Sequence, residues 1–231
     1  MTARVALITG ANRGIGLAVA ERLASDGWSL SLGVRKPESV PEHLAAAHLV
    51  HPYDANQPGC EEAWVAATLA RFGRIDAVIA NAGIMIPRTV IEAEEAEMRA
   101  MLDVNVLAPL RLVRAAWEPL KVSGRGRVVS IVSLSGKRVK YASSGAYSVS
   151  KFAALALAHA IRHAGWDLGI RSTAICPGLV ATDMAFGLTN MAPDEMTPPA
   201  DIARIVALVL DLPNTASVAE VPINCKIEEA Y

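Results

Sequence analysis

Short apolar runs alternate with longer helix-like stretches along the chain, and this alternation limits the possible folds more than any other feature. The apolar runs are Val5–Thr9, Ser29–Val34, Leu49–Tyr53, Ala77–Ala80, Arg127–Val132, Ser172–Ile175 and Val218–Ile223. They lack the apolar–polar alternation of half-exposed strands, so they suit strands buried on both faces. The stretches between them that favour helix are Ile15–Ser25, Glu61–Phe72, Glu95–Lys121, Ser148–Trp166 and Pro199–Leu210. Strand and helix in repetition predict a doubly wound α/β fold, with a mostly parallel sheet of about seven strands covered by helices on both faces.

No linker, low-complexity tract or repeat interrupts this pattern, so residues 1–231 are expected to form a single domain. The stretch 184–199, MAFGLTNMAPDEMTPP, breaks the rhythm with turn residues, prolines and several large apolar side chains. A long connection in a compact domain is usually either a functional lid or a disordered segment. We expect a substrate lid here, whose apolar residues line a pocket or else cap the core.

Composition excludes several classes of function. The net charge of −1 gives no basic field for nucleic acid or an anionic membrane surface. The three cysteines are far apart and odd in number, which fits free thiols better than disulfides or a metal site. The first apolar run begins at Val5, and no run approaches the length of a membrane span. These features predict a cytoplasmic protein without a signal peptide.

A glycine-rich turn follows the first predicted strand. Gly10, Gly14 and Gly16 allow a tight turn and a close approach of the backbone to a pyrophosphate, and the helix that starts here directs free N–H groups at the anion. Three glycines alone are weak evidence. Their position at the first strand-to-helix turn of an alternating chain is the context that this motif requires, so we expect a Rossmann-type dinucleotide site.

A second motif is the pair Tyr147 and Lys151, four residues apart at the start of a predicted helix. Residues at this spacing share a helix face, so the ammonium is expected beside the phenol. A neighbouring ammonium and the cationic ring of an oxidised nicotinamide favour the phenolate and lower the pKa of a tyrosine. Such a phenol can give or take a proton. Alone, this spacing is common and more typical of an ordinary helix surface.

Together these motifs resemble the short-chain dehydrogenase/reductase family, in its compact single-domain branch, from Val5 to about Thr182. The resemblance implies a catalytic set whose members are Asn105, Ser133, Tyr147 and Lys151. Asn105 would hold a water that relays protons to Lys151, and Ser133 would bind the substrate oxygen. The implied cofactor-binding residues, besides Tyr147 and Lys151, are Gly10, Asn12, Arg13, Gly14, Ile15, Gly16, Arg35, Asp54, Ala55, Asn81, Ala82, Gly83, Pro177, Gly178, Val180 and Thr182. No metal is implied.

Three departures from the family pattern concern the substrate more than the chemistry. Ala80 stands where Asn commonly precedes the Asn-Ala-Gly motif. The spacing between Ser133 and Tyr147 is one residue longer than usual, which leaves Ser135 as an alternative, although Gly136 favours Ser133. The tail VAEVPINCKIEEAY is similar to that of an NADP-using subgroup acting on small hydroxy compounds.

The residues after the second predicted strand favour NADP(H) over NAD(H). In an NAD-selective site an acid at the end of this strand binds the ribose 2′-hydroxyl, and that position is Val34 here. Arg35 follows and Arg13 lies in the glycine turn, where a guanidinium can bind a 2′-phosphate with two charged hydrogen bonds. Basic residues in loops are more often simply solvated.

The resemblance implies an oxidoreductase that moves a hydride between the nicotinamide and a small carbonyl or secondary alcohol, with Tyr147 as general acid and base. It also implies a homo-oligomer, a tetramer or dimer, paired through the helices around 95–121 and 147–166. A 3-oxoacyl carrier-protein reductase is one alternative, with Lys121, Arg125 and Arg127 as a docking patch. A non-catalytic dinucleotide sensor on the same fold is the other. The sequence does not identify the substrate.

Overall fold

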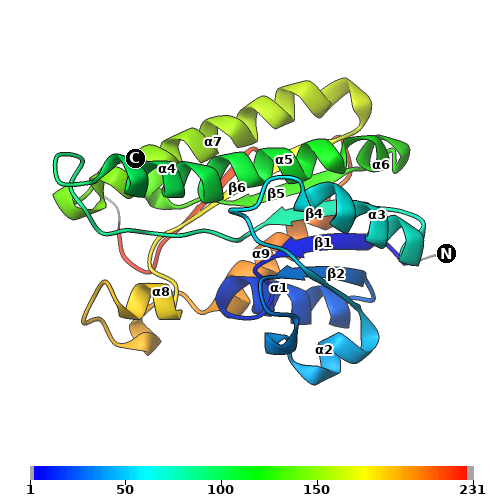
Figure 1. Cartoon of the computed structure of the whole chain (residues 1–231), viewed down its shortest axis with the longest axis horizontal. Helices are drawn as coiled ribbons and strands as arrows, with labels where there is room; N and C mark the ends of the chain where they lie inside the picture. The colour runs from blue at the N-terminus through cyan, green and yellow to red at the C-terminus, as the bar shows by residue number, and fades with distance from the viewer. Residues whose placement is uncertain (1–2, 228–231) are drawn as a thin grey trace.

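A computed structural model describes residues 3–227 and shows one parallel sheet with helices on both faces (Figure 1). Its seven strands lie in the order β3-β2-β1-β4-β5-β6-β7. Their bounds are Val5–Thr9 (β1), Ser29–Val34 (β2), Leu49–Pro52 (β3), Ala77–Ala80 (β4), Arg127–Ile131 (β5), Arg171–Pro177 (β6) and Glu220–Ile223 (β7). The predicted fold class and each predicted strand are thereby confirmed. The last four residues of the tail that resembled the NADP-using subgroup lie outside the described part.

Two helix layers cover the sheet. The main helices are α1 (Gly14–Ser25), α2 (Glu42–Ala47), α3 (Cys60–Phe72), α4 (Glu95–Leu102), α5 (Ala108–Ala115), α6 (Trp117–Val122), α7 (Gly145–Gly165), α8 (Asp183–Phe186) and α9 (Pro199–Asp211). Helices α1, α2 and α9 pack on one face, where Leu23, Leu44 and Val206 join a core with β1 and β2. Helices α3, α5 and α7 cover the other face, where Trp64, Leu112 and Ile161 are buried. Burial of both faces explains why the strands read as unbroken apolar runs.

The predicted helix Glu95–Lys121 is broken into several pieces. A single π-helical turn, Asp103–Leu107, joins α4 to α5, and α6 follows from Trp117. Periodicity could not show this turn, because both flanking helices keep an amphipathic pattern. π turns are frequent at functional sites, and this one carries Asn105. The short helix α2 was also not predicted, since its few residues give too little pattern.

The order of the strands in the sheet brings the predicted motifs together at the carboxyl ends of the strands. Strands β1 and β4 are neighbours although β2 and β3 intervene in sequence, so the connections from β1 and β4 leave in opposite directions. A crevice opens at such a switch point, outside the carboxyl ends of the strands, and it is the usual ligand site of open α/β sheets. In Figure 1 these ends point toward α8 and the segment after it. No helix in the described part of the chain is long and apolar enough to cross a membrane.

Candidate active site

The glycine turn after β1 is packed so closely that no side chain fits at Gly16. A Cβ added at Gly16 would lie 2.2 Å from the carbonyl oxygen of Gly10, and Gly10 itself has φ +64°. Helix α1 starts from Arg13 without a capping side-chain hydrogen bond and with no acidic residue in its first turn. Its first N–H groups are therefore available to an anion, and the dipole of the helix favours a negative charge there. The turn fits the pyrophosphate of a dinucleotide.

Thr9, at the end of β1, holds the Asn-Ala-Gly motif that follows β4. Its Oγ1 accepts hydrogen bonds from the backbone N–H of Asn81 at 2.9 Å and of Ala82 at 2.8 Å. The Asn81 amide in turn donates to the Thr9 carbonyl oxygen at 2.9 Å. Sequence reasoning did not single out Thr9 as a positioning residue, although it opens the TGANRGIG motif. It fixes the two strand ends that flank the crevice.

Tyr147 and Lys151 lie side by side on α7 as predicted, and both are buried. The Lys151 Nζ lies 5.6 Å from the centre of the Tyr147 ring and donates to the Ile131 carbonyl oxygen at 3.1 Å. A Cβ added at Gly83 would lie 3.6 Å from this Nζ. The ammonium therefore faces the Asn81–Gly83 segment, which is the wall expected to contact the cofactor.

The expected fall in the Tyr147 pKa is wrong for the protein groups alone. Burial raises the pKa of Tyr147 to about 12, while a hydrogen bond with the Ser133 side chain acts in the opposite direction. Burial likewise lowers the pKa of Lys151 to about 8. Removal of each group from water penalises its charged form, and this is the largest cause of both shifts. The sequence showed the spacing of the pair but not the depth of its burial.

Ser133 follows β5 and begins a short 3-10 turn, Leu134–Gly136. Its Oγ accepts the backbone N–H of Ser135 at 3.0 Å and lies within hydrogen-bonding reach of the Tyr147 phenol. A Cβ added at Gly136 would lie 2.6 Å from the Lys151 carbonyl oxygen, so this glycine lets the turn pack directly on α7. The geometry supports Ser133 rather than Ser135 as the partner of Tyr147.

Asn105, in the π turn, connects this region to the segment after β4. Its Oδ1 accepts the backbone N–H of Ile84 at 2.9 Å, and its Nδ2 donates to the Ile84 carbonyl oxygen at 2.9 Å and to Ser150 Oγ at 3.0 Å. Both amide hydrogens are therefore used within the protein. A relay water at this residue would have to donate its own hydrogen bond to an Asn105 oxygen.

The remaining predicted cofactor residues lie around the same crevice. Thr182 meets the glycine turn, since a Cβ added at Gly14 would lie 3.2 Å from Thr182 Cγ2. The Val180 segment is held by Thr197, whose N–H donates to the Leu179 carbonyl oxygen at 3.1 Å. Asp54 and Ala55 follow β3, where Arg111 bonds the Ala55 carbonyl oxygen at 2.7 Å.

The loops that carry Arg13 and Arg35 are tied together. Asn12, beside Arg13, donates to Ser39 Oγ at 3.0 Å, and Ser39 ends the turn that follows Arg35 and Lys36. Arg35 is exposed, and none of residues 3–227 forms an ion pair or hydrogen bond with its guanidinium. The loops that carry these two cations therefore lie together, while the Arg13 guanidinium itself pairs with Asp183 at 3.1 Å.

The apolar residues of segment 184–199 divide into two groups. Met184, Phe186 and Leu188 are between 40% and 48% exposed, whereas Met196 is buried. Met196 packs in the core and also lines the cavity between the start of α9 and the end of β7. The first three remain available to a ligand.

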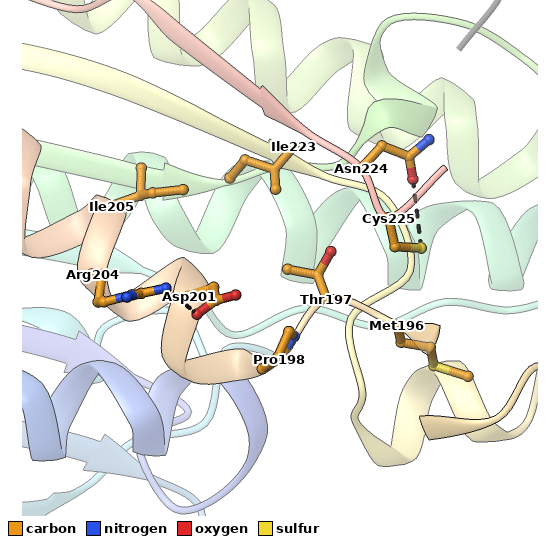
Figure 2. A pocket seen from close by; sticks show the side chains of 9 residues that line it. All are labelled: Met196, Thr197, Pro198, Asp201, Arg204, Ile205, Ile223, Asn224 and Cys225. Atoms are coloured by element: carbon orange, nitrogen blue, oxygen red, sulfur yellow. Dashed lines mark hydrogen bonds and ion pairs between the residues drawn. The ribbon is translucent and has the colours of Figure 1, made fainter. Parts of the chain in front are cut away.

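A cavity of about 560 Å³ lies between the start of α9 and the end of β7 (Figure 2). Its lining includes Thr197, Asp201, Arg204 and Asn224, but none of the predicted catalytic residues. It is a neighbour of the candidate site, which it touches through Thr197 and Asn224, and we do not assign the chemistry to it.

Burial of Lys151 predicts a pH-dependent cost in stability. The unfolded chain holds the Lys151 proton up to about pH 10.5, and the folded chain releases it near pH 8. The unfolded state therefore binds more protons in this window, and the free energy of unfolding rises with pH through it. Lys151→Met should raise the free energy of unfolding at neutral pH by up to about 3 kcal/mol. Denaturant titrations should show the two proteins converging as pH rises through the window. Parallel curves would contradict the burial of a charged lysine.

Comparison with known proteins agrees with this architecture. A family model described as short chain dehydrogenase matches residues 4–192. An agropine synthesis reductase from Rhizobium rhizogenes is 36% identical over 98% of this chain and 54% of its own length. The chain thus spans about half the length of the first curated relatives it matches.

Solved structures extend the comparison. An alcohol dehydrogenase from Thermococcus sibiricus, complexed with 5-hydroxy-NADP, superposes with a TM-score of 0.88 at 29% identity over 99% of both chains. A short chain dehydrogenase from Burkholderia cenocepacia in complex with NADP gives 0.87 at 27% identity over 97% of both. With a family model matching most of its length and a sheet that superposes on these enzymes, the chain belongs to the short-chain dehydrogenase family.

Proposed function

We propose that the chain is an NADP(H)-dependent oxidoreductase that interconverts a carbonyl compound and the corresponding secondary alcohol. The observation that carries this proposal is the convergence of Ser133, Tyr147, Lys151 and Asn105 beside the glycine turn. The printed names of the relatives, a reductase and an alcohol dehydrogenase, support the same reaction class.

In the proposed reaction the catalytic side chains bind the substrate oxygen and supply its proton. The bound nicotinamide supplies the hydride that reduces the carbonyl carbon. Ser133 and Tyr147 bind the carbonyl oxygen, and Tyr147 gives its phenolic proton to the oxygen as negative charge develops there. The products are the alcohol and the oxidised cofactor. Lys151 stabilises the resulting phenolate, and a proton returns to Tyr147 through Lys151 from a water held at Asn105. In the reverse direction Tyr147 removes the hydroxyl proton.

The preference for NADP(H) follows from Arg13 and Arg35, whose loops lie together at the end of β2 with no acid at Val34. We also propose that segment 184–199 is the substrate lid, with Met184, Phe186 and Leu188 facing a small, partly apolar substrate. The relatives bound to NADP or a derivative of it support the cofactor preference.

The three basic residues considered as a docking patch for a carrier protein do not support the 3-oxoacyl carrier-protein reductase alternative. Arg127 is buried and bonds Asn214 Oδ1 at 2.8 Å, and Lys121 pairs with Glu118. Arg127 starts β5, so this group lies at the amino ends of the strands, opposite the candidate site. The sensor alternative does not explain why all four catalytic residues are assembled.

The test of the proposed function is a turnover screen of carbonyl compounds with NADPH and of alcohols with NADP⁺, followed at the nicotinamide absorbance. We expect at least one small carbonyl compound to be reduced. Absence of turnover across aldehydes, ketones and sugars, with cofactor binding intact, would favour the sensor.

We further propose a homo-oligomer. Val149 and Phe152 on α7 and Leu107 before α5 are each between 43% and 45% exposed, which is unusual for large apolar side chains on adjoining helices. Packing of this apolar surface against a second copy of the chain would remove it from water. Light scattering at micromolar concentration should give at least a dimer mass, and Phe152→Glu should reduce it. A monomer mass for the unchanged protein would refute the proposal.

A further inference from the structure

An ion pair links the glycine turn to Asp183, the residue that directly precedes the proposed lid. Arg13 Nη1 lies 3.1 Å from Asp183 Oδ2, although the two residues are 170 positions apart. Arg13 caps α1 and Asp183 is the first residue of α8. The Thr182 side chain also packs against the glycine turn, because a Cβ at Gly14 would lie 3.2 Å from Thr182 Cγ2. The contact therefore lies beside the glycine turn at which the pyrophosphate is expected.

The two arginines proposed to bind the 2′-phosphate differ in whether their guanidinium already has an ion-pair partner. Arg35 has no ion-pair partner among residues 3–227, whereas the charge of Arg13 is neutralised by Asp183. The side chains of Arg13 and Asp183 are 67% and 72% exposed, so both can change conformation without disturbing the core. An exposed pair of this kind contributes little to stability and is easily exchanged for a stronger partner.

We infer that Asp183 is a cofactor-specificity residue that competes with the 2′-phosphate of NADP(H) for Arg13. A phosphate carries more charge than a carboxylate and binds a guanidinium through two parallel hydrogen bonds. When it takes Arg13, Asp183 loses its partner and α8 is released from the glycine turn. NAD(H) has no 2′-phosphate and leaves the pair intact. This inference rests on the proposed role of Arg13 in NADP(H) binding.

The test uses two nucleotides that lack the nicotinamide, adenosine 2′,5′-bisphosphate and adenosine 5′-monophosphate, so that the lid is not affected by substrate or nicotinamide. Calorimetry measures the affinity of both nucleotides for the unchanged protein, Asp183→Asn, Arg13→Ala and the double variant. Asp194→Ala is the matched control, because it removes one negative charge from the same segment without breaking an ion pair found within residues 3–227.

Asp183→Asn should bind the bisphosphate up to about fivefold more tightly, with the monophosphate unchanged. The gain should vanish in the Arg13→Ala background and should be absent in Asp194→Ala. A gain that persists without Arg13 would show direct repulsion of the phosphate and would overturn the inference. So would an unchanged affinity in Asp183→Asn.

Failure of the proposed function gives a different result. If the unchanged protein binds both nucleotides equally, the NADP(H) preference itself is wrong. A second readout is hydrogen exchange in the peptide that contains Asp183–Phe186. The bisphosphate, and not the monophosphate, should accelerate exchange there, and equal protection with both nucleotides would contradict release of α8.

Discussion

Tyr147→Phe should reduce turnover by about a hundred- to ten-thousand-fold while leaving cofactor affinity unchanged. The phenol is buried beside Ser133 and Lys151 and is the proposed proton donor, so its loss removes an interaction that is made only as the alkoxide forms. The substitution removes a single oxygen from a buried ring, and the fold should be preserved. Steady-state kinetics with a carbonyl substrate, together with titration of NADPH binding, measure the two quantities.

Ser135→Ala is the matched control for the neighbouring hydroxyl. Ser133→Ala should lower kcat, since this side chain bonds Tyr147, whereas Ser135→Ala should leave it near the unchanged value. Turnover by Tyr147→Phe close to that of the unchanged enzyme would refute the mechanism. The opposite ranking of the two serines would reassign the substrate-binding hydroxyl.

Replacement of the residues at the end of β2 should move the cofactor preference toward NADH. Each charged contact to a 2′-phosphate contributes about ten- to hundredfold in affinity. Val34→Asp combined with Arg35→Ala removes one such contact and supplies an acceptor for the ribose hydroxyl, so kcat/KM should fall with NADPH and rise with NADH. An unchanged protein that favours NADH, or a variant whose preference does not move toward NADH, would contradict the assignment.

The Val34→Asp substitution should also lower the stability of the protein, because Val34 lies in the core. Val34 is only 2% exposed and packs in the same cluster as Val40 and Leu44, so an acid there lowers stability as well as changing specificity. Arg35→Ala alone touches no core residue and should lose NADPH efficiency without gaining NADH efficiency. Thermal melting of both variants separates the change in specificity from a loss of fold.

The sheet was predictable from sequence because its inner strands are buried on both faces and so read as nearly unbroken apolar runs. The glycine turn was predictable for a similar reason, since Gly10 and Gly16 meet steric demands that leave no choice of residue. Features that depend on the burial of a strand or on the close approach of the backbone can therefore be predicted from local sequence patterns.

Other features depend on contacts between distant segments and could not be predicted. The π turn around Asn105 is hidden within an amphipathic pattern, and its partner Ile84 lies far away in sequence. The pKa values of Tyr147 and Lys151 depend on burial created by several elements at once. The pair of Arg13 with Asp183 joins the first helix to the lid, and neither residue alone indicates the other.

Transfer of label from the cofactor tests the central claim most directly. The reagent is NADPH in which both hydrogens on the nicotinamide C4 are replaced by deuterium. The enzyme should reduce the carbonyl compound found in the screen to an alcohol with one deuterium on its carbinol carbon. The hydroxyl proton should come from solvent through Tyr147. Mass spectrometry of the product detects this. An alcohol without deuterium, or consumption of NADPH without any alcohol, would contradict direct hydride transfer at this site.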